Sequence, residues 1–118
     1  MKYMLLIVSD PDIPSPAPGD EGFDAYMGAW SEYTEALVDA DAYVSGEALQ
    51  GPDTATTVRQ SGGSSAIVDG PFAELKEHLG GYYLIDVDTL DEAIEWARQL
   101  PVGEGGVEVR PVFPTDGY

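Results

Sequence analysis

Two segments that are apolar on both sides of an extended chain constrain the fold most. Residues 3–8 read YMLLIV and residues 82–87 read YYLIDV. Successive residues of a strand point to opposite faces of its sheet, so both faces of these strands need cover from water. We therefore predict two neighbouring central strands whose sheet is buried on both sides.

Two amphipathic helices are predicted between the strands. One begins at Phe23 and repeats its apolar residues with a period of 3.6, leaving an acidic face for solvent. The other follows a Thr89-x-x-Glu92 capping box and ends before Pro101. The expected apolar stripes are Phe23, Tyr26, Met27, Trp30, Thr34, Leu37 and Val38 in the first helix, and Leu90, Ala93, Ile94 and Ala97 in the second.

The remaining patterns complete an α+β order. Further strands are predicted over residues 43–49, 54–60, 65–68 and 107–112, the middle two as a hairpin, with a short helical turn over 72–78. This order fits a ferredoxin-like sandwich with an inserted β-hairpin and both helices on one face of the sheet. The other face needs a second copy of the chain, or else the proline-rich residues 10–22 or the hairpin folding over it.

Composition limits the partners. The 118 residues fit one domain, 1–118, and carry 5 Lys plus Arg against 22 Asp plus Glu, a net charge of −17. Such a surface cannot neutralise phosphates, which argues against nucleic acid and against anionic membranes. The chain has no Cys, which excludes thiolate metal sites, and its first apolar stretch is too short for a signal peptide. We expect a cytoplasmic protein.

Five motifs in order carry a resemblance to a known family. They are GEAL at 46–49, DGPFAE with KE at 69–77, GGYYLIDV at 80–87, LDEA at 90–93 and VEVRPV at 107–112. Together they resemble the DGPF branch of the YCII-related (YciI-like) family. The resemblance implies a ferredoxin-like protomer in a dimeric α/β barrel, with no settled reaction. It also implies that relatives are often encoded beside sigma factors of the extracytoplasmic-function type.

One departure from the family pattern bears on catalysis. YciI-like relatives are suspected enzymes because of a His–Asp pair whose His lies on the first helix. Residues 28–31 read GAWS at that place, so the pair does not carry over. Any chemistry must rest on other groups.

The segment 69–77 is the main candidate site. It presents Asp69 at a turn, the aromatic Phe72, two acids at Glu74 and Glu77, and Lys76, one of five cations. A lysine among carboxylates stays protonated and could hold an anionic ligand group, and its neighbours could hold an amine. The alternative is a capped turn in which Asp69 accepts backbone N–H bonds, Phe72 anchors the core and Lys76 forms an ion pair in solvent.

Three residues are candidate acids or bases. His78, the single histidine, could be a general base oriented by Glu74 or Glu77, or simply a surface residue. Glu47 is a candidate if its strand buries it and an ordinary wet carboxylate if the strand is an edge. Asp69 is the third. No spacing predicts a metal site or a cofactor, and the acids near residue 90 are explained by a helix dipole.

Three functions remain open. The first is a homodimer that binds a small polar or aromatic metabolite near the dimer interface, with Asp69, Phe72, Glu74, Lys76 and Tyr83 as ligand-binding residues. The second is a cofactor-free enzyme, isomerase-like or lyase-like, that uses Glu47, Asp69 or Glu74 as base. The third is an accessory protein in a sigma-factor stress pathway, which predicts an apolar patch exposed on the dimer.

Overall fold

The computed structural model describes residues 1–13, 15–73 and 75–115. Along the chain lie β1 (Lys2–Ser9), α1 (Phe23–Asp39), β2 (Tyr43–Ala48), the 3₁₀ turn η1 (Pro52–Thr54), β3 (Thr56–Ser61), β4 (Ser64–Asp69), β5 (His78–Asp86), α2 (Leu90–Arg98) and β6 (Gly105–Pro111). A four-stranded antiparallel sheet has the order β2-β5-β1-β6, and β3 and β4 pair with each other alone. This α+β arrangement is compatible with the predicted ferredoxin-like plan and its inserted hairpin.

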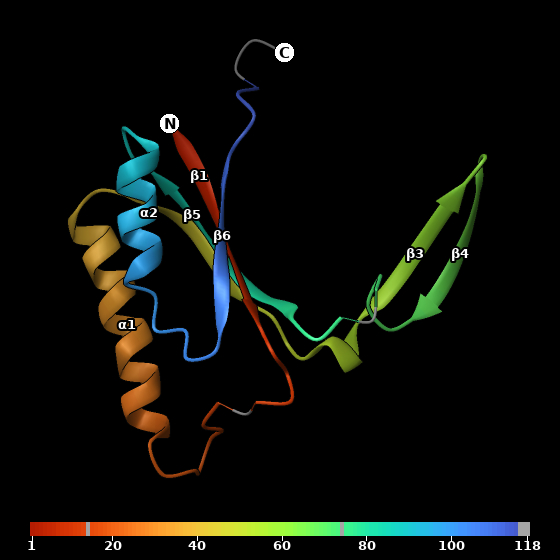
Figure 1. Ribbon diagram of the computed structural model, residues 1–118, viewed down its shortest axis with the longest axis horizontal. Helices are drawn as coiled ribbons and strands as arrows, with labels where there is room; N and C mark the ends of the chain where they lie inside the picture. The colour runs from red at the N-terminus through yellow and green to blue at the C-terminus, as the bar shows by residue number, and fades with distance from the viewer. Residues whose placement is uncertain (14, 74, 116–118) are drawn as a thin grey trace.

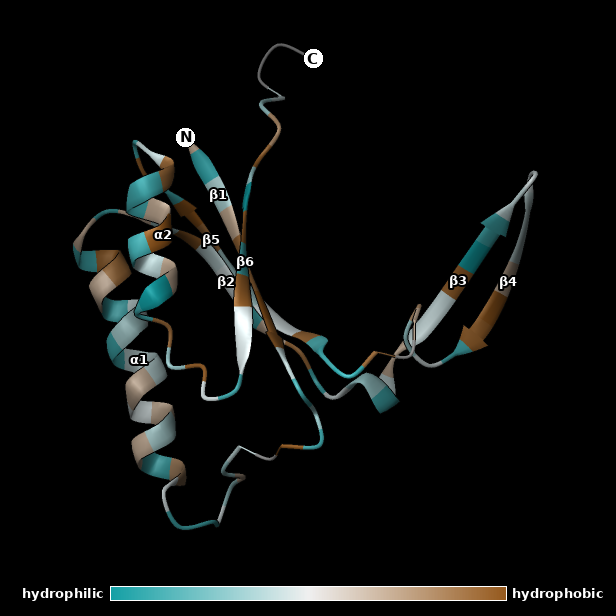
Figure 2. Cartoon of the chain, viewed as in Figure 1, coloured by the Kyte–Doolittle hydropathy of each residue, from teal (hydrophilic) through white to brown (hydrophobic). Residues whose placement is uncertain are grey.

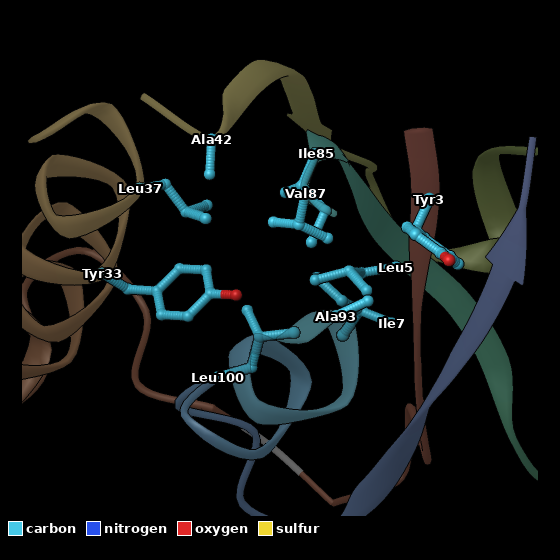
Figure 3. Packing of buried hydrophobic residues seen from close by; sticks show 10 residues of the cluster. All are labelled: Tyr3, Leu5, Ile7, Tyr33, Leu37, Ala42, Ile85, Val87, Ala93 and Leu100. Carbon is cyan, nitrogen blue, oxygen red and sulfur yellow. The ribbon is translucent and has the colours of Figure 1, made fainter. Parts of the chain in front are cut away.

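Both helices lie on one face of the four-stranded sheet, as Figure 1 shows. The buried cluster fills the layer between the helices and the sheet, with Leu5, Leu37 and Ile85 fully enclosed. Figure 3 shows Tyr33 and Leu37 of α1 pointing toward the side chains of the sheet. The two central strands are the predicted ones, since β1 and β5 pair along their whole length.

Along β1 and β5 the other face of this sheet is apolar and has neither helix over it, and the edge strands add Glu47, Glu108 and Arg110 to that face. The register sets Met4 opposite Leu84 and Leu6 opposite Tyr82, alternating with the buried Tyr3, Leu5 and Ile7. We call Met4, Leu6, Val8, Tyr82 and Leu84 the open face. All five are half-buried, which confirms that apolar residues occupy both sides of the central strands.

The β3–β4 hairpin extends away from the rest of the molecule (Figure 1). We call residues 56–69 the arm and the remainder the body. The Cα radius of gyration is 16.4 Å, whereas a compact domain of this length has about 13.5 Å. The arm therefore does not fold over the open face, which was one of the expected ways to cover it.

Several local expectations are corrected. Residues 72 and 73 and 75 to 77 form no helical turn, and β5 begins at His78 rather than at Tyr82. In α1 the buried residues are Tyr33 and Leu37, whereas Val38, placed in the apolar stripe, is 54% exposed. Helix α1 packs by a face rotated toward Tyr33 because that ring reaches α2, where its hydroxyl donates to the carbonyl of Trp96 at 2.8 Å.

The start of α2 follows its sequence pattern. Thr89 Oγ1 accepts from the Glu92 backbone N–H at 3.2 Å, as a capping box requires. The Glu92 carboxylate accepts from the N–H of Asp88 at 3.4 Å rather than from Thr89. Within the predicted stripe Ala93 is buried, but Leu90 is 47% exposed because it begins the helix at the edge of the layer.

Candidate functional site

A cavity of about 510 Å³ lies between α1 and the sheet edge formed by β2 and β5. Its wall includes Tyr26, Met27, Trp30 and Thr34 of α1, Tyr43, Gly46 and Glu47 of β2, Tyr82 and Tyr83 of β5, and Glu104 before β6. The end of β1 and the loop after it also line the cavity. This volume is in the usual range for small-molecule sites.

Four rings form a continuous aromatic wall in this cavity. Trp30 lies nearly parallel to Tyr83, with 6.5 Å between ring centroids. Tyr26 meets Trp30 edge-on at 6.3 Å, one helical turn earlier on α1, and Tyr43 meets Tyr83 edge-on at 6.3 Å. We call Tyr26, Trp30, Tyr43 and Tyr83 the aromatic wall. Edge-to-face and parallel pairs of this kind fix ring positions beyond what burial alone does.

A hydrogen-bond chain holds the centre of the wall. Thr34 Oγ1 donates to the Trp30 carbonyl at 3.0 Å and lies 2.6 Å from the Tyr83 hydroxyl. A threonine hydroxyl has one proton, which the Trp30 carbonyl takes, so Tyr83 donates to Thr34. The Tyr83 oxygen therefore keeps its lone pairs as acceptors.

The indole N–H of Trp30 is the least satisfied polar group of the site. Its Nε1 atom is buried, and no residue in the described ranges accepts its proton. An unpaired buried donor of this kind costs about 1 to 3 kcal/mol. Trp30 also lines the cavity.

Gly46 makes room for the Tyr83 ring. A Cβ atom at position 46 would lie 2.9 Å from Tyr83 Cδ1, closer than carbon atoms approach. The glycine on β2 thus lets the ring lie across the neighbouring strand. The GEAL motif was noted in the sequence, but its glycine could be assigned this role only once its cross-strand neighbour was known.

Tyr33 is more deeply buried than its neighbour Tyr83. Tyr33 is 5% exposed and lies beneath the wall, where its ring meets Tyr83 edge-on at 5.3 Å. Burial, with a smaller contribution from Tyr83, raises the pKa of Tyr33 well above its usual value. Tyr33 therefore keeps its proton in alkaline solution beyond pH 10, and its hydroxyl donates to the backbone carbonyl of Trp96.

Glu47, a candidate acid or base, lies on the edge strand β2 and is exposed. It lines the cavity, and the register sets it opposite Tyr82, on the open-face side of the sheet. This environment matches the alternative in which Glu47 is an ordinary solvated carboxylate on an edge strand. Tyr83, a candidate ligand-binding residue, is at the centre of the cavity wall.

The described residues of the segment 69–77 are not part of this cavity. Asp69 is the last residue of β4 and is exposed, Lys76 is exposed, and Glu74 lies outside the described residues. The turn is held instead by Gly70, whose N–H donates to the Ala55 carbonyl at 2.8 Å and whose carbonyl accepts from Thr57 Oγ1 at 2.7 Å. The structure thus separates Asp69, Phe72 and Lys76 from Tyr83.

Phe72 is not the core anchor that the alternative interpretation of this segment expected. It is 68% exposed, and the guanidinium carbon of Arg59 lies 4.5 Å from its ring centroid. Arg59 Nη2 also donates to the Phe72 carbonyl at 2.9 Å. This double contact joins the arm to the segment that leads back to β5.

His78 lines a second, more open cavity of about 650 Å³ at the base of the arm, together with Phe72 and Glu77. No side-chain hydrogen bond joins His78, Glu47 and Asp69 to one another in the ranges that the structure describes. The three candidate acids and bases are therefore at separate places. Glu74 or Glu77 was expected to orient His78 from a helical turn, and the described residues of 72–77 form no such turn.

Metal and membrane sites are not seen in the described ranges. Those residues hold no group of three or more His, Cys, Asp or Glu placed to bind a metal ion. Neither α1 nor α2 has the length and hydropathy of a membrane-spanning helix.

Comparison with known proteins places the chain in a family. The family model of the YCII-related domain matches residues 1–116. The chain belongs to the YCII-related family. A relative of this YCII-related chain is an uncharacterised protein of Rhizobium meliloti (strain 1021), 37% identical over 115 residues, which are 95% of this chain and 92% of the relative. The expected resemblance to a YciI-like family is thus confirmed, and it assigns no activity.

Proposed function

We propose that this YCII-related chain is a homodimer that binds a small metabolite with an aromatic or apolar part in the cavity beside α1. The observation that carries the proposal is the aromatic wall. Four rings from three elements surround a space of about 510 Å³, where a protein core would be filled. Tyr83 and Thr34 supply the polar contacts that orient a ligand.

The open face supports the homodimer. Five half-buried apolar side chains cover one side of β1 and β5, and a second copy would bury them. Charge favours the same contact, because two chains of −17 each can approach only through surfaces that carry little charge. Back-to-back sheets would give the dimeric α/β barrel that the resemblance implies.

The arm supports the same assembly. Its charged residues, Arg59 and Asp69, cancel, so it is the uncharged part of a strongly acidic chain. It also exposes Ile67 at 75% and Val58 at 54%, which face each other across the hairpin. An arm that reaches the partner would bury these residues without bringing acids together.

Light scattering at micromolar concentration tests the dimer. We expect twice 12.6 kDa for the wild type, and a shift toward one chain for Leu6→Glu, which puts a charge on the open face. Glu35→Gln on the exposed side of α1 is the control and should stay dimeric. A wild-type mass near 12.6 kDa contradicts the assembly.

A metabolite screen by thermal shift tests the cavity. Any compound that raises the melting temperature is repeated with Tyr26→Ala and Tyr43→Ala, which are partly exposed and remove wall rings, and with Lys76→Ala. We expect the stabilisation to fall in the two wall variants and to persist in Lys76→Ala. The reverse pattern moves the site to the segment 69–77, and hits that are equal in all variants place it elsewhere.

A cofactor-free enzyme is the second candidate, and the presence of Glu47 in the cavity lining favours it. Because Glu47 is on the open-face side of β2, a partner sheet would be needed to remove it from water. The expected result is that Glu47→Gln abolishes turnover of a bound ligand while its affinity stays within a few fold. An accessory role in a sigma-factor pathway predicts instead that the arm stays open to amide exchange in the dimer.

A further inference from the structure

The charged residues around the cavity all have one sign. Glu47 and Glu104 line it, and no Lys, Arg or His is among its described lining residues. The three arginines have contacts elsewhere: Arg98 pairs with Glu95 at 3.2 Å, Arg110 with Glu108 at 3.7 Å, and Arg59 lies over Phe72. With a net charge of −17 on the whole chain, the potential in the cavity is negative.

The aromatic wall adds to this preference. The face of an aromatic ring is the negative part of its quadrupole and attracts a cation within about 6 Å of the centroid. Indole gives the strongest such contact, and Trp30 is at the middle of the wall, between Tyr26 and Tyr83. Rings and carboxylates thus favour the same charge on a ligand.

We propose that the ligand of this cavity is an organic cation, a protonated or quaternary amine that carries an apolar group. The inference rests on the proposed function and specifies its ligand class. An anion would enter a negative cavity with no cation to pair with. A neutral compound would pack against the aromatic wall but gain nothing from the Glu104 carboxylate.

Three probes of one shape separate these cases. Phenyltrimethylammonium, tert-butylbenzene and benzenesulfonate share a phenyl ring and a tetrahedral head group that is positive, neutral or negative. Binding is followed at low salt through the two tryptophan indole N–H resonances, which Trp96→Phe assigns. Trp30 lines the cavity, whereas Trp96 packs on α2 against Tyr33, outside the lining.

The expected result is that the cation shifts the Trp30 resonance and binds about tenfold or more tightly than the neutral probe. Benzenesulfonate should leave that resonance in place. Glu104→Gln should weaken the cation severalfold. Glu35→Gln removes the same charge from the exposed side of α1 and should have a smaller effect.

The other outcomes separate the two proposals. Equal binding of all three probes at Trp30, or tighter binding of benzenesulfonate, overturns the cation and leaves the binding function standing. Equal weakening by Glu104→Gln and Glu35→Gln also overturns the cation site, since attraction by the overall charge would then explain the binding. A Trp30 resonance that none of the probes moves overturns both proposals.

Discussion

The body and the arm of this chain are both made of regular elements, yet they differ in where their apolar residues go. In the body Leu5, Leu37 and Ile85 are fully enclosed between helices and sheet. In the arm Val58 and Ile67 pair across the hairpin and still expose more than half of their surface. Figure 2 shows apolar stretches of the arm far from the helix-covered sheet. The contrast teaches that a correct strand pattern can form without a core.

Charge divides the molecule in the same way. The arm holds one Arg and one Asp, so the body carries the entire −17. Stability of the isolated chain should therefore depend on burial and charge in the body. Residues of the arm should matter for association with a second copy, which is where its exposed side chains would be buried.

The largest expected effect compares a truncation in each region. Leu37→Ala removes a fully buried side chain and should lower the free energy of unfolding by about 2 to 5 kcal/mol. Ile67→Ala removes a side chain that is 75% exposed and should change it by less than about 0.5 kcal/mol. Urea unfolding at a concentration where the chain is monomeric measures both. Similar losses in the two variants would mean that the arm packs on the body.

The second effect is specific to the body and appears at alkaline pH. The pKa of Tyr33 is raised above its usual 10.0, so the folded state keeps a proton that the unfolded state loses. The resulting stability is complete below pH 10 and falls as pH rises further, by about 1.4 kcal/mol per pH unit. Tyr33→Phe should remove this slope in urea unfolding between pH 9 and 11. An unchanged slope would assign it to another group.

A smaller effect concerns the joint between the regions. Arg59→Ala removes the contact with the Phe72 ring and the hydrogen bond to its carbonyl. The groups are exposed, so we expect a loss of less than about 1 kcal/mol in the free energy of unfolding. Amide exchange should nevertheless become faster at Gly70 and along β3 and β4, and stay as in the wild type along β1. Arg59→Lys is the comparison, because it keeps the positive charge but loses the planar guanidinium group.

The smallest effect is that of salt. Like charges in the body repel, so the melting temperature should rise as NaCl goes from millimolar to several hundred millimolar, where screening acts over about 8 Å or less. A chain whose residues 56–69 are replaced by two glycines should give the same rise, because those residues carry no net charge. Ala55 and Gly70 are already hydrogen-bonded, so this deletion joins neighbours. A flat salt response would show that the acids are too well solvated to matter.

The candidate site was predicted only in part. Tyr83 was named as a ligand-binding residue and Glu47 as a candidate base, and both line the cavity. Trp30 was interpreted as a packing residue, and Tyr26, Thr34 and Tyr43 were not recognised as site residues. The one available signal was the helical spacing of Tyr26 and Trp30 together with the Tyr82-Tyr83 pair. It could not reveal a cavity, because nothing local tells which strand faces a helix.

The candidate site at residues 69–77 stays a prediction. Its mixture of acids, Lys76 and Phe72 looked like a site, but its described residues lie at the base of the arm, away from Tyr83. Phe72 and Glu77 line the second cavity together with His78, whereas Tyr83 lines the cavity beside α1. Sequence proximity could not show that Tyr83 is separate from them.

The sequence by itself determined the elements and their order. Alternating and helical apolar periods, the Thr89 cap and the turn glycines act over a few residues, so they can be recognised locally. The tertiary structure alone decided that the hairpin stands away from the sheet, that Tyr33 is buried in place of Val38, and that four aromatic rings meet around a cavity. These outcomes depend on contacts between residues far apart in the chain, and side-chain packing selects among them only after the elements have formed.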